Sequence, residues 1–291
     1  MRRWRVLCGL GLSVIAGHAE AARWTTEAAW TTCQFTHGVL VVTAQVGGLT
    51  GPFILDTATA TSVLDATQAS LAGLAAGEVR APVRFAGRRW PALRVTVAAL
   101  DARTRAMPTP VTGILGADIL DDRVLEVRPE PCRLRLTARP ARQGPTLAVL
   151  PIERRGGLAY VLASVSDGEQ AKRGLMRVAT GTDLALRLAP DAARLEGASA
   201  GAQGLTASLR AISLGDLLIE NPRGALASAA SPGVLGEIGE PVWSRYGFVL
   251  DLRRGRLTLF TPTKRHGGMP FKDRTPATPP GLLIRTGGSR R

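Results

Sequence analysis

The sequence predicts a mostly-β protein built from two similar lobes. Short runs of aliphatic and β-branched residues alternate with turn residues along most of the 291 residues, and helical patterns are few. In the first half, the stretch Phe53–Asp65 carries an apolar strand into Asp56, Thr57 and a small residue. A related stretch, Met176–Thr182, returns in the second half. A repeat of this kind indicates two lobes that face each other.

The first 21 residues are typical of a secretory signal peptide. Met1–Arg5 is basic, Val6–Gly17 is apolar, and small residues at Ala19 and Ala21 suit the cleavage position. The 12 residues of the apolar stretch are too few to span a bilayer, which needs about 20. We therefore expect an exported protein, periplasmic or secreted, without a transmembrane anchor after cleavage.

The net charge of +14 does not predict specific nucleic-acid binding. Only three of the 37 basic residues are Lys, and the Arg residues are scattered rather than gathered in a basic helix. The first five residues carry +3, and the segment 263–291 carries +6, which leaves +5 for the remainder. The segment 263–291 is rich in Pro, Gly, Arg and Thr, and is expected to be a basic disordered tail. Such a tail attracts acidic partners or membrane surfaces without specificity.

Two cysteines, Cys33 and Cys132, remain once Cys8 leaves with the signal peptide. They flank the first repeat, one before its first strand and one in its last. An even number of cysteines in an oxidising compartment favours a disulfide, and two free buried thiols are the alternative.

Strand signals follow one another through the first half. Gly38–Val46 alternates weakly, the pair Gly47-Gly48 marks a tight turn, and Gly51–Leu55 continues as a strand. The segments 83–89 and 93–97 alternate polar and apolar residues and predict a hairpin.

The two halves end alike. Arg133–Thr137 alternates strictly, as a half-buried strand should, and a similar pattern recurs at Arg254–Leu259. We expect a first lobe at 34–139, a linker rich in Pro, Arg and Gly at 140–149, and a second lobe at 150–262. Three short helices are expected, at 65–75, 118–122 and 190–195.

The motifs carry a resemblance to a known family. Phe-Ile-Leu-Asp-Thr-x-x-x-x-Ser-Val-Leu from Phe53, Gly-Ile-Leu-Gly-x-Asp-x-Leu from Gly113, and the final Arg-Leu-x-Leu strand resemble the retropepsin/pepsin-type aspartic peptidases. The likeness is greatest to bacterial exported members that carry two such repeats in one chain, and it spans about Gln34 to Thr261. It implies a bilobal acid-protease fold with two β-barrel-like repeats, a polypeptide substrate or peptide ligand, and no cofactor.

The resemblance also assigns roles to residues. In this family two aspartates share a proton, the ionised one activating a water and the protonated one donating to the scissile carbonyl. Asp56 matches the catalytic acid of the first lobe, and Ala179 stands where the second acid belongs. The loop-supporting positions are matched by Thr57, Ala58, Gly116, Thr180, Gly181 and Gly236. The supporting segments start at Gly113, 57 residues after Asp56, and at Gly233, 54 residues after Ala179.

The missing acid leaves two functions open. Losing one general acid or base costs typically about 10²–10⁴ in rate, so one interpretation is weak acid-type hydrolysis through Asp56. The other is a catalytically inactive pseudopeptidase that binds extended peptides.

No other acid is expected to replace the missing one. Asp183 is on the wrong side of the turn to replace Ala179, and a homodimer that pairs two Asp56 groups is disfavoured because the second lobe occupies that interface. We therefore expect a monomer. The alternative for Asp56 is a purely structural role, as an acid that caps an ordinary turn.

Other motifs are weaker. Gly197–Gly201 has the Gly-x-Ser-x-Gly spacing of a serine hydrolase, but that motif needs a preceding strand and a following helix. Gly197–Thr206 is the better candidate for a substrate-covering flap, because the first-half counterpart, Leu74–Pro82, is short. No metal site is expected, since His37 and His266 are isolated from other ligands.

Overall fold

The computed structural model describes most of the two expected lobes. The described residues are 28–100, 104, 107, 110–140, 144–190, 198–201, 204–207, 209–226 and 232–261. The expected signal peptide, the expected tail and nearly all of the expected helix at 190–195 lie outside them.

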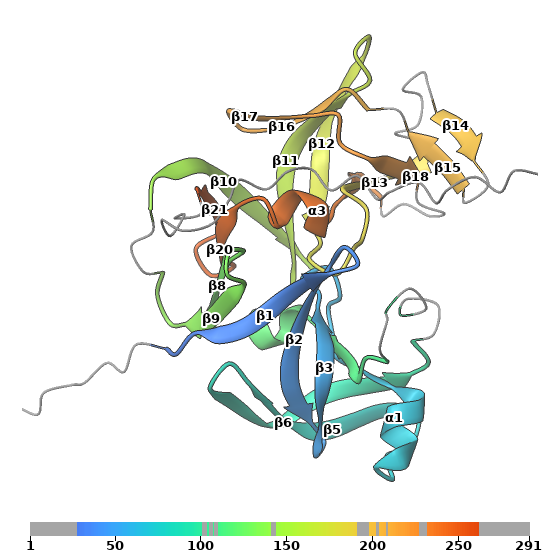
Figure 1. Cartoon of the computed structure of the whole chain (residues 1–291), viewed down its shortest axis with the longest axis vertical. Helices are drawn as coiled ribbons and strands as arrows, with labels where there is room; N and C mark the ends of the chain where they lie inside the picture. The colour runs from blue at the N-terminus through green and yellow to red at the C-terminus, as the bar shows by residue number, and fades with distance from the viewer. Residues whose placement is uncertain are drawn as a thin grey trace, which may run out of the picture.

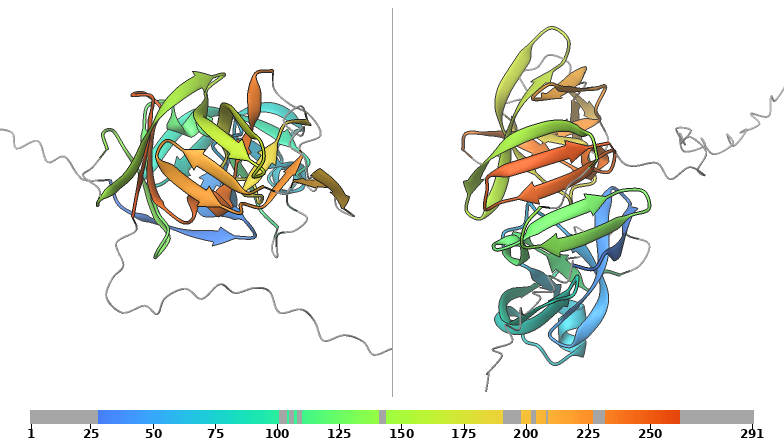
Figure 2. Two further views of the ribbon diagram at one scale, coloured as in Figure 1. Left: turned by 90° about the horizontal axis from the view of Figure 1, so that it is seen from above. Right: turned by 90° about the vertical axis from the view of Figure 1, so that its left-hand side faces the viewer.

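Two β lobes share one six-stranded antiparallel sheet, which we call the central sheet (Figure 1). Its strands run in the order β1 (Thr31–Thr36), β9 (Arg133–Thr137), β8 (Val124–Arg128), β20 (Gly247–Asp251), β21 (Arg256–Phe260) and β10 (Thr146–Arg155). The first three strands belong to the first half of the chain and the last three to the second half, as the side view in Figure 2 shows. Because β10 begins at Thr146, part of the segment expected to be a linker is a strand.

Among its described residues, the first lobe adds a second sheet and the two short helices named below. The strands are β2 (Val39–Val46), β3 (Leu49–Leu55), β4 (Val63–Asp65), β5 (Gly77–Phe85), β6 (Arg88–Ala98) and β7 (Gly113–Leu115). The helices are α1 (Ala66–Leu71) and the 3₁₀ helix η1 (Ala117–Leu120), both near the predicted positions. The Asp65 carboxylate caps α1 by accepting from the backbone N–H groups of Thr67 and Gln68.

The second lobe follows the same plan with one added strand. Its remaining elements are β11 (Leu158–Ser166), β12 (Ala171–Val178), β13 (Leu186–Leu188), β14 (Ala198–Gly201), β15 (Gly204–Ala207), β16 (Ala211–Leu214), β17 (Leu217–Glu220), β18 (Gly224–Leu226), β19 (Val234–Ile238) and the helix α3 (Glu240–Trp243). β14 is the added strand; it forms a hairpin with β15, which pairs with β18 as β5 pairs with β6, and the hairpin covers most of the stretch predicted as a flap.

The two lobes repeat the same strand connections. In the first lobe β3 runs parallel to β7, and in the second lobe β12 runs parallel to β19. The lobes meet where β8 pairs with β20, Glu126 facing Val249. The predicted mostly-β, two-repeat fold is therefore confirmed.

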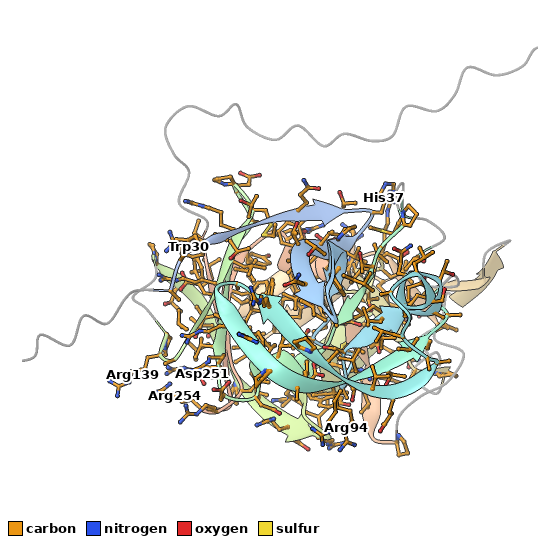
Figure 3. The ribbon with its side chains drawn as sticks, turned by 90° about the horizontal axis from the view of Figure 1, so that it is seen from below. Trp30, His37, Arg94, Arg139, Asp251 and Arg254 are labelled. Carbon is orange, nitrogen blue, oxygen red and sulfur yellow. A yellow bond between two sulfur atoms is a disulfide. The ribbon has the colours of Figure 1, made fainter. Side chains whose placement is uncertain are left out.

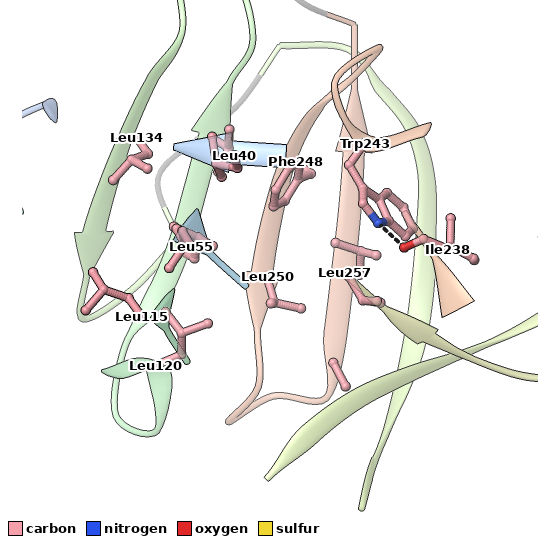
Figure 4. Close-up of a cluster of buried hydrophobic side chains, with 14 of the residues drawn as sticks. Leu40, Leu55, Leu115, Leu120, Leu134, Ile238, Trp243, Phe248, Leu250 and Leu257 are labelled. Carbon is pink, nitrogen blue, oxygen red and sulfur yellow. Dashed lines mark hydrogen bonds between the residues drawn. The ribbon is translucent and has the colours of Figure 1, made fainter. Parts of the chain in front are cut away.

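One hydrophobic core runs through both lobes (Figure 4). Leu134 and Leu136, the apolar positions of the alternating strand β9, are fully buried. In the second lobe the Trp243 indole is 1% exposed and its Nε1–H donates to the Ile238 carbonyl at 2.7 Å. The core is built mainly from Leu, Val and Ala, as the scarcity of aromatic residues requires.

A disulfide closes the first lobe. Cys33 and Cys132 are bonded across 99 residues, so the predicted pairing is confirmed. It joins β1 to the turn before β9. Figure 3 labels Trp30 and His37, which directly precede and follow β1. Among the described residues, no helix has the length and apolar character needed to cross a bilayer.

Candidate functional site

Asp56 stands at the end of β3, in a loop held from several sides. Its backbone N–H donates to the Leu115 carbonyl of β7 at 2.9 Å, and the residue is only 2% exposed. One carboxylate oxygen accepts from the N–H of Ala58 at 2.9 Å and from the N–H of Gly181 at 3.2 Å. The other accepts from the Thr59 hydroxyl at 2.7 Å. The donor from Gly181 belongs to the second lobe, so Asp56 lies where the two loops meet.

Two threonines lock the loops together with nearly symmetrical hydrogen bonds. The Thr57 hydroxyl donates to the Val178 carbonyl at 2.6 Å, and the Thr180 hydroxyl donates to the Leu55 carbonyl at 2.7 Å. Each hydroxyl also accepts the backbone N–H of the opposite threonine, at 3.1 and 3.3 Å. Both side chains are buried, so these four bonds fix the two loops face to face.

The second loop repeats the backbone of the first without its acid. Ala179 is fully buried, and its N–H donates to the Ile238 carbonyl at 2.9 Å, as Asp56 does to Leu115. The hydroxyl three residues on has changed its partner. Thr59 donates to Asp56, whereas Thr182 donates to Glu237 of β19 at 3.3 Å.

The structure moves the second supporting glycine from Gly236 to Gly239. Gly116 and Gly239 each follow the strand residue that accepts the loop N–H, and each lies 60 residues after its loop position, Asp56 or Ala179. A Cβ on Gly116 would lie 2.7 Å from the Thr59 carbonyl oxygen, and one on Gly239 would lie 2.6 Å from the Thr182 carbonyl oxygen. Gly236 instead lies inside β19, where a Cβ would meet the backbone of β13.

A side-chain bracket supports the first loop. Asp118 accepts from the Ser62 N–H at 2.8 Å and from the Ser62 hydroxyl at 2.7 Å, and that hydroxyl accepts from the Gly116 N–H at 3.0 Å. Burial raises the pKa of the Asp118 carboxyl, while the Ser62 donors oppose that rise. In the second lobe the matching positions hold Ala185 and Pro241, which have no polar side-chain atoms.

The small residues of the two loops are not equivalent. A Cβ on Gly181 would lie 2.5 Å from the Asp56 Cβ and 2.6 Å from its Cγ, so a glycine is required there. Ala58 is the matching residue of the first loop, and the symmetric threonine bonds relate it to position 179 as Gly181 is related to Asp56. Ala58 keeps an ordinary negative φ, so its methyl brings no backbone strain. An alanine at 58 is compatible with an alanine at 179, but the Gly181 geometry indicates that it would crowd an aspartate there.

An ion pair beside the second loop was not predicted. The Arg177 guanidinium pairs with Glu237 and also donates to the Ala58 carbonyl of the first loop at 3.5 Å. Sequence reasoning missed this pair because the two residues lie 60 positions apart and only the strand register joins them.

Two weaker candidates are placed elsewhere. Asp183 lies against the β1–β2 turn, where a Cβ on Gly38 would meet its backbone at 2.7 Å, and its carboxylate is 3.8 Å from Arg187. Ser199 lies within β14, in a β-hairpin, and not in a strand-to-helix turn. The serine-hydrolase geometry is therefore not formed at this motif.

A search of the solved structures returned the crystal structure of an aspartic proteinase from Irpex lacteus. The two share 16% sequence identity with a TM-score of 0.54, and the match covers 81% of this chain and 97% of that one. This chain has an aspartic-proteinase fold. No family model matches the sequence, and no curated protein does. At this identity the comparison establishes the aspartic-proteinase fold and nothing about activity.

Proposed function

We propose that this chain is an exported, retropepsin-like two-repeat protein that binds extended polypeptides between its lobes without hydrolysing them by the two-carboxylate mechanism. The feature that carries the proposal is the presence of alanine at both 58 and 179, which are the positions that the symmetric threonine bonds match to Gly181 and Asp56. In the first lobe's half of the site, Asp56 packs against a glycine; in the mirrored half, an alanine holds each of the two positions. Ala58 and Ala179 both differ from the family pattern, and they are sterically compatible with each other. This compatibility supports a site that functions without a second acid.

The surroundings of position 179 point in the same direction. The bracket that supports the Asp56 loop, Ser62 and Asp118, is replaced by Ala185 and Pro241. The hydroxyl of Thr182, which matches the one bound to Asp56, is engaged by Glu237. Two polar side chains that support the first loop therefore have no counterpart here and the Thr182 hydroxyl has another partner, while the threonine bonds that hold the loops remain.

One observation favours a second candidate, weak acid-type hydrolysis through Asp56. Its loop is complete: three donors address the carboxylate, and the threonine bonds hold it against the second lobe. A lone carboxylate positioned in this way could still act as the base toward a water. The test below separates the two candidates.

The test is peptide cleavage between pH 3 and 7, with a mixed peptide substrate and mass-spectrometric detection. We expect no cleavage by the wild type or by Asp56→Asn, and little by Ala179→Asp alone, because Ala58 crowds the new carboxylate. The double variant Ala58→Gly with Ala179→Asp should gain cleavage. Its matched control, Ala58→Gly with Ala179→Asn, has the same shape without the acid and should stay inactive.

Two results would change the conclusion. Cleavage by the wild type that is lost in Asp56→Asn would establish the second candidate. A double variant that folds, as judged by its thermal unfolding, and stays inactive would show that more than the acid and its glycine has been lost. Binding itself is measured by calorimetry with unlabelled peptides, as described below.

A further inference from the structure

The two lobes present matching rows of side chains beside their loops, and the rows differ in chemistry. Each row is defined by direct register partners on four neighbouring strands, so its members share one face of the sheet. The first-lobe row, which we call the aliphatic row, consists of Val41, Ile54, Ile114 and Val63. The second-lobe row, which we call the charged row, consists of Tyr160, Arg177, Glu237 and Arg187.

Both rows lie next to the place where the loops meet. Side chains two residues apart on a strand point to the same face, so Ile54 shares its face with Asp56 and Arg177 shares its face with Ala179. The Arg177 guanidinium reaches the carbonyl of Ala58, in the Asp56 loop, at 3.5 Å. A polypeptide lying over Asp56 would therefore pass one row on each side.

The aliphatic row is filled by the protein itself. Ile54 and Ile114 are each 1% exposed and pack with Val39, Leu100 and Val111 in a separate apolar cluster. The charged row is more open, because the side chain of Arg177 is 22% exposed and that of Arg187 is 41% exposed. Only the second row offers charged groups to a ligand.

The unused hydrogen-bonding capacity of the charged row consists mainly of donors. The two Glu237 oxygens already accept from Arg177 and from Thr182. Arg177 uses two of its five N–H donors in bonds to Glu237 and Ala58. Arg187 is 3.8 Å from Asp183, an exposed pair of the kind that contributes little. With two arginines and one glutamate, the row carries a net charge of +1.

We propose that the charged row selects an acidic side chain of the bound polypeptide, on the second-lobe side of Asp56. Arg187 is the accessible contact, and Arg177, fixed by Glu237, supplies donors closer to the loops. This inference rests on the proposed polypeptide binding and adds its specificity: an acidic, extended segment is preferred to a neutral or basic one.

The experiment uses three capped dodecapeptides that share a Val- and Ala-rich sequence and carry Glu, Gln or Lys at the same four positions. Calorimetry at low salt should give the Glu peptide about tenfold tighter binding than the Gln peptide, and the Lys peptide weaker binding still. Arg187→Glu and, separately, Arg177→Gln should remove the preference. The matched control is Arg84→Glu, the same charge change on an exposed residue of β5 in the first lobe, which should keep it.

The outcomes separate the inference from the function on which it rests. If none of the three peptides binds, the proposed function and the inference both fall. If all three bind alike, polypeptide binding stands and the charged row is not its specificity element. A Glu preference that survives Arg187→Glu, or that is lost equally in Arg84→Glu, would also overturn the inference, because overall charge and not the row would then account for it.

Discussion

The two loops at the centre of this molecule share the same supporting hydrogen bonds and differ in the side chain at the position of Asp56 and Ala179. Thr57 and Thr180 make the same pair of bonds in opposite directions, and Gly116 and Gly239 pack against their loops in the same way. At the position that Asp56 and Ala179 share, only the first loop carries a carboxylate. The difference teaches that the threonines and glycines maintain this architecture, and that the acid can be lost without loss of the fold.

The contrast extends beyond the missing acid. Around Asp56 the polar groups are Ser62, Asp118 and Thr59, and the neighbouring row is aliphatic. Around Ala179 the bracket is apolar and the neighbouring row is charged. In the first lobe the polar side chains therefore lie around the loop, whereas in the second lobe they lie on the strands beside the loop.

The largest expected effect is on stability and comes from the Cys33–Cys132 disulfide, which lies in the first lobe. Replacing Cys33 and Cys132 together with Ala opens a loop of 99 residues and should lower the free energy of unfolding by about 4–5 kcal/mol in the chain-entropy model. Denaturant unfolding measures the total loss. Hydrogen exchange should show more lost protection in β2 and β3 than in β12 and β19, and an equal loss in both lobes would mean that they unfold as one unit.

The next largest expected effect is also on stability, and it tests whether Gly239 is the counterpart of Gly116. A Cβ on Gly239 would lie 1.8 Å from the Leu184 carbonyl oxygen, whereas the shortest approach of a Cβ on Gly116 would be 2.7 Å. Gly239→Ala should therefore cost about 3 kcal/mol or more and Gly116→Ala somewhat less, both measured by denaturant unfolding. Gly144→Ala is the control, because its Cβ would come no nearer than 3.7 Å to the Thr261 carbonyl oxygen. A Gly239→Ala variant as stable as the control would return the supporting role to Gly236.

The smallest effect concerns two acids at matching helices, the partly buried Asp118 in η1 and the buried Glu240 in α3. Burial raises the pKa of both, and the hydrogen bond from Ser244 opposes the rise for Glu240. The folded state therefore binds a proton more tightly than the unfolded state, and stability falls as the pH rises through and above about 4.5, the ordinary pKa of Glu. Glu240→Gln should stabilise the protein modestly at pH 7, and this gain should vanish at low pH.

The comparison with Asp118 sharpens that prediction. Asp118→Asn should show the same sign of pH dependence, but it breaks the Ser62 bracket and should be destabilising overall. Thermal unfolding from pH 3 to 8 measures both variants. Glu153→Gln, at an exposed site, is the control and should change little. A gain for Glu240→Gln that grows toward low pH would contradict the assignment.

Much of this architecture could be predicted because its signals are local. Alternation identified the strand Arg133–Thr137, turn glycines separated β2 from β3, and the count of cysteines indicated the bond between Cys33 and Cys132. The likeness of the two halves predicted a repeat, and the structure contains it. The assignment of a catalytic role to Asp56 remains a prediction.

What could not be predicted depends on register between distant strands. The segment from Gly233 to Gly239 contains three glycines at equal spacing, so the sequence offered two matches to Gly116, and only the hydrogen bond from Ala179 to Ile238 decides between them. The partnership of Arg177 with Glu237, and the bracket of Ser62 with Asp118, arise in the same way. Such pairs become visible once β19 and η1 are placed against their loops.

The central sheet makes each half of this chain the natural partner of the other. If the chain were cut between β9 and β10, each half would keep three strands of the central sheet. The unpaired edge strand would be β8 in one fragment and β20 in the other. An open edge of this kind pairs readily with another strand, and the best complement available is the edge just removed. The two fragments should therefore rejoin when mixed, held by the pairing of β8 with β20 together with the threonine bonds between the loops.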